Sequence, residues 1–264
     1  MKKGLLIILA LLSCFQSFSQ NSGFCGLEND AFKSGESITY KVYYNVSFAY
    51  IGAGEVTFTT TLADLDGRPA YHVVGEGHTY HSYDWIFKVR DRYETFIDSG
   101  SLLPLKFIRD VNEGDYHKYN VVTFDHERNT ATSLQGTYHV PSCIQDVLSA
   151  IYYARNIDFD KYKPDDKIYF SMFLDNEVYH IYIRYLGREN VTTRYGTFRA
   201  IKFRPLLIKG TIFSGGEKMT VWVSDDGNKI PLRINTPITV GSIKVDLTGY
   251  KNLRHPFTSL ISRN

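Results

Sequence analysis

The run Asp84–Asp125 reads DWIFKVRDRYETFIDSGSLLPLKFIRDVNEGDYHKYNVVTFD, and its pattern decides the fold. It divides into three segments in which apolar and polar residues alternate, Asp84–Ile97, Leu102–Val111 and Tyr116–Asp125. Two short stretches rich in Asp, Asn, Ser and Gly separate them, and these residues are typical of β-turns. The pattern therefore predicts three antiparallel strands joined by tight turns.

The same alternation continues on both sides of this run. The further strands expected are Ser37–Asn45, Gly54–Leu65, Ala70–Tyr80 and Thr130–Thr137, and then Lys167–Leu174, Val178–Gly187, Lys218–Ser224, Lys229–Asn235 and Val240–Tyr250. The run Val191–Arg204 is also strand-like but contains its own turn near Tyr195-Gly196. Hairpin-type residues follow several of them, as at Asp66-Gly67 and Asp175-Asn176. A sheet of about 12 or 13 strands exposes two edges unless it curls or splits. We expect one mainly β domain over residues 37–251, a strongly curved antiparallel meander forming an open barrel, with a two-layer sandwich as the alternative.

One segment departs from the strand pattern. Pro141-Ser142 precedes Cys143–Arg155, in which apolar residues recur at helical spacing. Ser142 and Gln145 have the spacing of a capping box. We expect one principal amphipathic helix near 142–155, packed on the concave side of the sheet and forming the seam between any two halves.

The N-terminus has the features of a secretory signal. Lys2 and Lys3 precede an apolar run over 4–12 that is too short to span a bilayer. We expect a signal peptide over 1–19, an N-terminal arm over 20–36 and a loose C-terminal tail over 252–264. Leu11-Leu12-Ser13-Cys14 is loosely similar to a lipobox, so a lipid anchor at Cys14 is an alternative to plain cleavage.

Charge and composition narrow the class of protein. The chain has 264 residues, 30 basic and 28 acidic, and loss of Lys2 and Lys3 with the signal leaves 28 of each sign. A neutral chain has no overall attraction to nucleic acid, so no nucleic-acid partner is expected. No later segment is long and apolar enough for a transmembrane span. We expect an exported, periplasmic protein, with outer-membrane association as an alternative to a free periplasmic form.

Two cysteines, Cys25 and Cys143, remain after the signal is removed. In an oxidising compartment an even number of cysteines favours a disulfide, although two unpaired thiols are the alternative. Such a bridge would tie the N-terminal arm to the start of the helix.

The candidate motifs for catalysis or metal binding are weak. Asp98-Ser99-Gly100 follows two apolar residues, as in aspartic proteases, but that chemistry needs a second carboxylate, and the same residues form a good turn. His78, His81 and Glu76 lie close in sequence but lack the spacing of a zinc site. We expect no catalytic residue, no metal and no cofactor.

The remaining indication of function is a set of aromatic residues. Trp85, Phe87, Tyr152, Phe170 and Trp222, with Tyr153 and Phe173, are candidates to line a hollow in the curved sheet and to bind an apolar ligand. The alternative is that these side chains fill an ordinary core.

Four segments resemble a known family. AFKSGESITYKVYYN (Ala31–Asn45), AGEVTF (Ala53–Phe58), VRDRYETFIDSGSLLPLKF (Val89–Phe107) and VWVSDDGNKIPLRI (Val221–Ile234) are similar to the domain-of-unknown-function 3108 family. The resemblance implies a secreted bacterial protein of the Bacteroidetes type and brings no catalytic residues with it. The long meander with one central helix is also similar in architecture to the half-barrels of periplasmic lipoprotein carriers.

Three functions follow as hypotheses. The first is a non-enzymatic periplasmic protein that binds or carries an apolar or amphipathic ligand, such as a lipid, or binds an envelope protein. The second is a structural or assembly factor of the cell envelope that works through protein partners. The third is a hydrolase of lipid or glycan whose site has no recognised motif.

Overall fold

The computed structural model describes residues 25–46, 49–208, 215–238 and 241–263. The expected signal peptide and Cys14 lie outside the described residues. The strands are β1 (Ser37–Val46), β2 (Ala49–Leu65), β3 (Arg68–Thr79), β4 (Arg90–Asp98), β5 (Pro104–Glu113), β6 (Tyr116–Asp125), β7 (Thr130–Ser133), β8 (Gly136–His139), β9 (Lys167–Leu174), β10 (Glu177–Thr192), β11 (Gly196–Pro205), β12 (Thr220–Ser224), β13 (Pro231–Pro237), β14 (Ser242–Lys251) and β15 (Leu260–Arg263). The helices are α1 (Val147–Ala154) and two single 3₁₀ turns, η1 (His81–Tyr83) and η2 (Phe159–Lys161).

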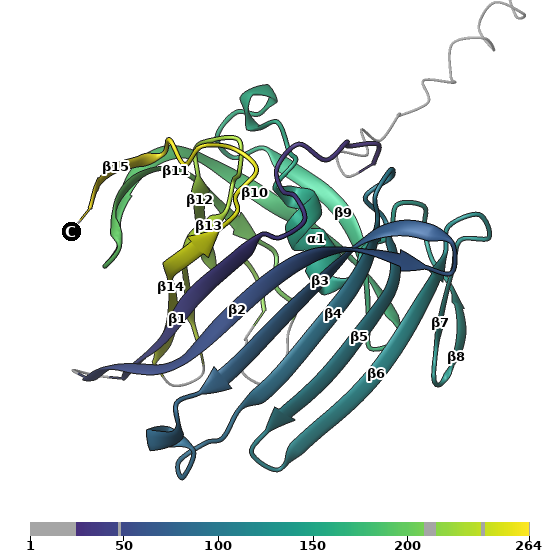
Figure 1. Ribbon diagram of the computed structural model, residues 1–264, viewed down its shortest axis with the longest axis horizontal. Coiled ribbons are helices and arrows are strands. Elements are labelled where there is room, and N and C mark those ends of the chain that lie inside the picture. The colour runs from purple at the N-terminus through teal and green to yellow at the C-terminus, as the bar shows by residue number, and fades with distance from the viewer. Residues whose placement is uncertain (1–24, 47–48, 209–214, 239–240, 264) are drawn as a thin grey trace, which may run out of the picture.

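The described strands form one 15-stranded antiparallel sheet in the order β8-β7-β6-β5-β4-β3-β2-β1-β14-β13-β12-β11-β10-β9, with β15 added to β11. The first strand therefore lies in the middle of the sheet, between β2 and β14. The chain runs outward from it to the β8 edge, crosses through α1, and returns from the β9 edge. The sheet curves around α1 and stays open (Figure 1). The expected open, curved meander with one principal helix is confirmed.

Turn residues set the register of the hairpins as the sequence predicts. Asp66 and Gly67 both have positive φ, 56° and 82°, between β2 and β3. A type I′ turn needs this conformation, and its twist matches that of the flanking strands. Asp175 and Asn176, with φ of 52° and 66°, do the same between β9 and β10.

The helix begins later than expected, and the predicted capping box is wrong. Cys143 has a φ of +58°, which no helix accommodates, and Gln145 forms backbone hydrogen bonds with β9 on both sides. Asp146 is the N-cap instead: its carboxylate accepts from the backbone of Leu148 and Ser149, and the Ser149 hydroxyl accepts from the Asp146 N–H. The disulfide at Cys143 and the strand contact of Gln145 hold the segment before Asp146 in a non-helical path.

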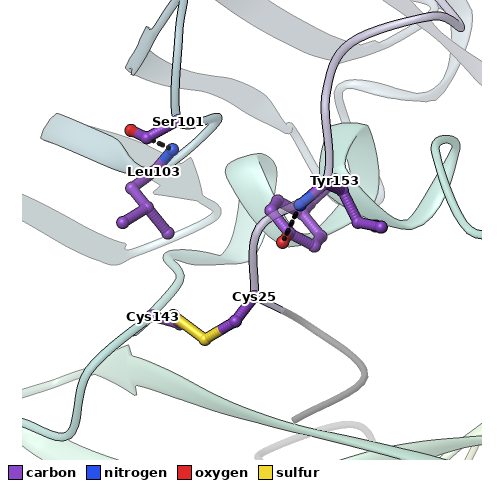
Figure 2. The surroundings of a disulfide bond; sticks show 6 residues. Cys25, Ser101, Leu103, Cys143 and Tyr153 are labelled. Carbon is purple, nitrogen blue, oxygen red and sulfur yellow. Dashed lines mark hydrogen bonds between the residues drawn. A yellow bond between two sulfur atoms is a disulfide. The ribbon is translucent and has the colours of Figure 1, made fainter.

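A disulfide and a hydrogen bond near its start attach the N-terminal arm to α1 and to the segment before it. Cys25 and Cys143 are joined by a disulfide, with their Cα atoms 5.6 Å apart. The Tyr153 hydroxyl accepts a hydrogen bond of 3.0 Å from the Leu27 N–H (Figure 2). The expected bridge is therefore present, and it joins the arm to the segment that leads into α1.

Expectations for two strands and for the tail are corrected. The run expected over Thr130–Thr137 divides into the hairpin of β7 and β8. The long strand expected to start at Asp84 starts at Arg90, because residues after β3 fold into η1 and the following turn. The tail expected to be loose over 252–264 is ordered up to Arg263. Phe257 packs against Phe198 with ring centroids 5.6 Å apart, and β15 pairs with β11. The last expected strand begins at residue 240, outside the described residues, and β14 begins at Ser242.

Candidate functional site

A cavity of about 220 Å³ lies on the concave face, between α1 and strands β2, β3 and β4. Its walls are almost entirely apolar. It is lined by Val56, Phe58, Gly75, Gly77, Asp91, Tyr93, Val147, Leu148 and Ile151. A second cavity of about 160 Å³ adjoins it and shares Val56, Gly77 and Asp91 with it. Together the two form one hollow that follows β2 and β3 away from the helix.

Two glycines of β3 make room for this hollow. Side chains alternate along a strand, so Gly75 and Gly77 are on the same face as Val73, which belongs to the main core. A Cβ at Gly75 would lie 2.8 Å from the Phe58 ring, and one at Gly77 would lie 3.5 Å from a Val56 methyl. Glycine within a strand often marks a place where something else approaches the backbone closely. Here Gly75 lets the Phe58 ring lie close to the strand, and the more open space at Gly77 belongs to the cavity.

The helix supplies the opposite wall. Its N-cap, Asp146, also accepts a hydrogen bond of 2.7 Å from the Thr95 hydroxyl on β4, which fixes the helix start against the sheet. Leu148 is buried, whereas Ile151 is 40% exposed although both line the cavity. The apolar Ile151 side chain therefore lies at the opening.

The hollow is polar where its two cavities meet, because Asp91 lines both. Burial, and the neighbouring Asp110 carboxylate to a lesser extent, raise the pKa of Asp91, which accepts a 3.0 Å hydrogen bond from the Asn112 N–H. Burial and then the charge of Asp91 raise the pKa of Glu113, which lies behind Asp91 and lines neither cavity. Burial raises the pKa of Tyr93 to about 12. Asp91 and Tyr93 can accept and exchange hydrogen bonds within an otherwise apolar space.

A charged cluster lies next to Tyr93, which pairs with Arg109 across β4 and β5. Arg109 on β5, only 9% exposed, pairs with Asp175 from the β9–β10 turn, and Lys118 pairs with the same carboxylate at 2.6 Å. This contact joins the second half of the sheet to the first. The charged side chain that faces the hollow is Asp91, because Glu55 alternates with Val56 along β2 and lies on the opposite face.

The aromatic residues singled out in the sequence lie elsewhere. Trp85 is 82% exposed and Phe87 is also exposed, both in the turn before β4. Tyr152 is buried in the main core, where its hydroxyl accepts from Thr60 at 3.1 Å, and Phe170 packs at the edge of that core. Trp222 donates to Glu189 at 2.7 Å beside the second core cluster.

None of these five aromatic residues lines either cavity, and the structure does not bring them together. Tyr153 and Phe173 are likewise buried in the main core. The lining residues were missed because aromatic content is a poor guide to an empty space. A better signal was Gly75-Glu76-Gly77, two glycines on one face of a strand.

The other motifs have structural roles. The Asp98 carboxylate accepts from the backbone of Gly100 and Ser101, so Asp98-Ser99-Gly100 forms a turn. Across the described ranges, no three His, Cys, Asp or Glu side chains gather closely enough to hold a metal ion. No helix in that part of the chain is long and apolar enough to cross a membrane.

The sheet, its inner helix and the cavity define an open, curved β protein with a hollow concave face. The chain belongs to the DUF3108 family, proteins of unknown function, whose family model matches residues 39–248. The family resemblance is thereby confirmed. No curated protein matches the chain.

One of three similar solved structures shows the same kind of fold. A beta-barrel-like protein of the domain of unknown function DUF1849 from Brucella abortus has a TM-score of 0.56 at 10% identity, over 84% of this chain and 99% of that one. A predicted lipoprotein of Parabacteroides distasonis has a TM-score of 0.39 at 14% identity, over 85% and 100%. A predicted exported protein with a YmcC-like fold from Bacteroides fragilis has a TM-score of 0.33 at 11% identity, over 86% and 100%.

Proposed function

We propose that this chain is an exported, non-enzymatic binding or carrier protein for an amphipathic ligand. The observation that carries the proposal is the apolar hollow between α1 and β2–β4. Its two parts together exceed the lower end, about 300 Å³, of typical ligand pockets. The apolar part of the ligand lies between Phe58, Val147 and Ile151.

Asp91 sets the ligand's head group. Its carboxylate lines both cavities, and no lysine or arginine does among the described lining residues. Carboxylates accept hydrogen bonds and attract cations. The head group is therefore a hydrogen-bond donor, such as a hydroxyl or an amine, rather than a carboxylate or phosphate.

The proposed location is the periplasm. The signal-like N-terminus and the disulfide between Cys25 and Cys143 both support it, because disulfides persist in oxidising compartments. Fractionation of cells that express the full chain tests the location. Recovery in the cytoplasm with both cysteines reduced would contradict it.

Native mass spectrometry of protein purified from its own cells tests the function. The wild type should carry a stoichiometric apolar or amphipathic species. Gly77→Leu fills the hollow from β3 and should release that species. Gly249→Leu is the matched control, a strand glycine of the same sheet whose Cβ would meet only Thr39 at 3.9 Å. Two results together would overturn the proposal: the wild type shows only the mass of the polypeptide, and Gly77→Leu binds an added alkyl alcohol as well as the wild type does.

A further inference from the structure

Three consecutive apolar side chains protrude between β3 and β4. Trp85, Ile86 and Phe87, here called the tip, are 82%, 61% and 53% exposed. Tyr116, at the start of β6, is also largely exposed. The β3–β4 connection and the β5–β6 turn lie next to each other at the lower end of the sheet in Figure 1. The Gly114 N–H donates to the Lys88 carbonyl at 2.8 Å, which joins the two turns.

The base of the tip is held by ionic and backbone hydrogen bonds. Arg90 donates to the Asp84 carboxylate at 2.7 and 3.1 Å, and the Thr79 hydroxyl donates to the same carboxylate at 2.8 Å. Hydrogen bonds from Arg90 and Thr79 lower the pKa of Asp84 to about 2, so the carboxylate is ionised at neutral pH.

Hydrogen bonds also hold the backbone of the tip, and the Trp85 Nε1–H donates to the Ser82 carbonyl at 3.0 Å. The N–H groups of Ile86 and Phe87 both donate to the Tyr83 carbonyl, at 2.9 and 3.1 Å. The Phe87 ring lies over the β5–β6 turn, 3.1 Å from the position of a Cβ on Gly114. A surface held in place in this way loses little conformational entropy when it binds a partner.

The size and composition of the tip fit a lipid surface better than a protein. Its exposed apolar area is on the order of 400 Å², whereas a stable protein interface needs about 800 Å² per partner. Trp and other aromatic side chains favour the interface between water and lipid. The exposed Lys88 follows the tip directly and can contact lipid phosphates.

We propose that the tip enters the interfacial layer of a lipid bilayer and holds the protein there. The second cavity is lined by Thr79 and Val89, the residues that close the base of the β3–β4 connection. Contact through the tip thus brings one end of the hollow close to the membrane. The inference goes beyond the proposed ligand and does not depend on what fills the hollow.

Co-sedimentation with vesicles tests the proposal. The probes are vesicles of phosphatidylcholine alone and vesicles of phosphatidylcholine with phosphatidylglycerol. The wild type should bind both, and more tightly the anionic ones because of Lys88. Changing Trp85, Ile86 and Phe87 together to Ser should lower the partition coefficient by at least about tenfold. A matched triple, Leu62→Ser, Leu134→Ser and Ile261→Ser, removes exposed apolar side chains elsewhere and should bind as the wild type does.

Fluorescence locates the contact. The chain has two tryptophans, so Trp222→Phe leaves Trp85 as the only one. Lipids with brominated chains should quench its emission. Absence of vesicle binding by the wild type, or equal loss in the two triples, would overturn the proposal. The variant Gly77→Leu should still bind vesicles. If Gly77→Leu lost vesicle binding, the lipid would have to enter the hollow without insertion of the tip, and this result would also overturn the proposal.

Discussion

At the scale of single residues, Asp146 connects the helix to the sheet. This contact places its carboxyl group in the protein interior, where the ionised form is unfavourable. Its side chain accepts from Leu148, Ser149 and Thr95, and it is fully buried. Burial raises its pKa to about 6, although the three hydrogen bonds oppose that change. The carboxyl therefore binds a proton more tightly in the folded than in the unfolded state.

Asp146 should make the protein less stable as the pH rises. Below about pH 4 the carboxyl is protonated in both states, and between about pH 4 and 6 only the folded state keeps the proton. The wild type should lose about 2 kcal/mol relative to Asp146→Asn between pH 4 and 7. Urea unfolding at each pH gives the free energy of unfolding of both proteins. The contributions of the other titrating groups are the same in both, so they cancel in the difference. A constant difference would show that Asp146 is ionised throughout.

Asp91 should determine which head group binds. Asp91→Asn removes a carboxylate from the hollow while its side-chain oxygen can still accept from the Asn112 N–H. A charge-assisted hydrogen bond is worth about 1.5–3 kcal/mol, so affinity for an alkylamine should fall by at least about tenfold. Affinity for the alcohol of the same chain length should change much less. Calorimetry with both ligands checks this, and equal losses for both would indicate a damaged hollow instead.

At the scale of elements, Arg155 at the end of α1 joins three parts of the chain. Its guanidinium contacts Glu36 at 2.6 and 2.8 Å, and both side chains are almost fully buried. It also donates to the carbonyls of Asn228 and Ala31, at 2.9 and 3.1 Å. The helix is thereby fixed to the N-terminal arm and to the β12–β13 turn.

Arg155→Ala should be among the most destabilising substitutions in the chain. It leaves the Glu36 carboxylate buried without its cation, which typically costs about 3–5 kcal/mol. Arg128→Ala is the control, because Arg128 pairs with Asp125 at the surface and should contribute less than about 1 kcal/mol. Chemical unfolding of both variants measures the effect. Similar losses in the two would mean that the buried pair contributes no more than a surface pair.

The elements also show what the sequence could predict. Period-two alternation and turn residues such as Asp66-Gly67 depend on local chemistry, so most strands and hairpins were predictable. The helix start was not, because it depends on Gln145 pairing with β9 and on the disulfide at Cys143. The cavity was not predictable either, since it depends on how Phe58 packs over Gly75 and on the distance between α1 and the curved sheet.

At the scale of the whole molecule, the disulfide offsets a weakness of the topology. The two halves of the sheet meet at β1 and β14, and their outer edges, β8 and β9, follow each other in the chain only through α1. The chain loses much conformational entropy when it forms contacts between residues so far apart in the sequence. The bridge from Cys25 to Cys143 spans 118 residues and encloses the whole first half of the sheet.

Removal of this bridge should lower stability more than any surface change. Chain-entropy arguments put the loss for Cys25→Ser with Cys143→Ser at about 4–5 kcal/mol, and measured losses are often smaller. The reason is that the unfolded chain gains freedom over the enclosed residues while the contacts around Tyr153 and Arg155 remain. Urea unfolding with and without reductant measures the loss, and reductant should leave the double variant unchanged. An unchanged midpoint for the reduced wild type would mean that the arm is held in place by Tyr153 and Arg155 alone.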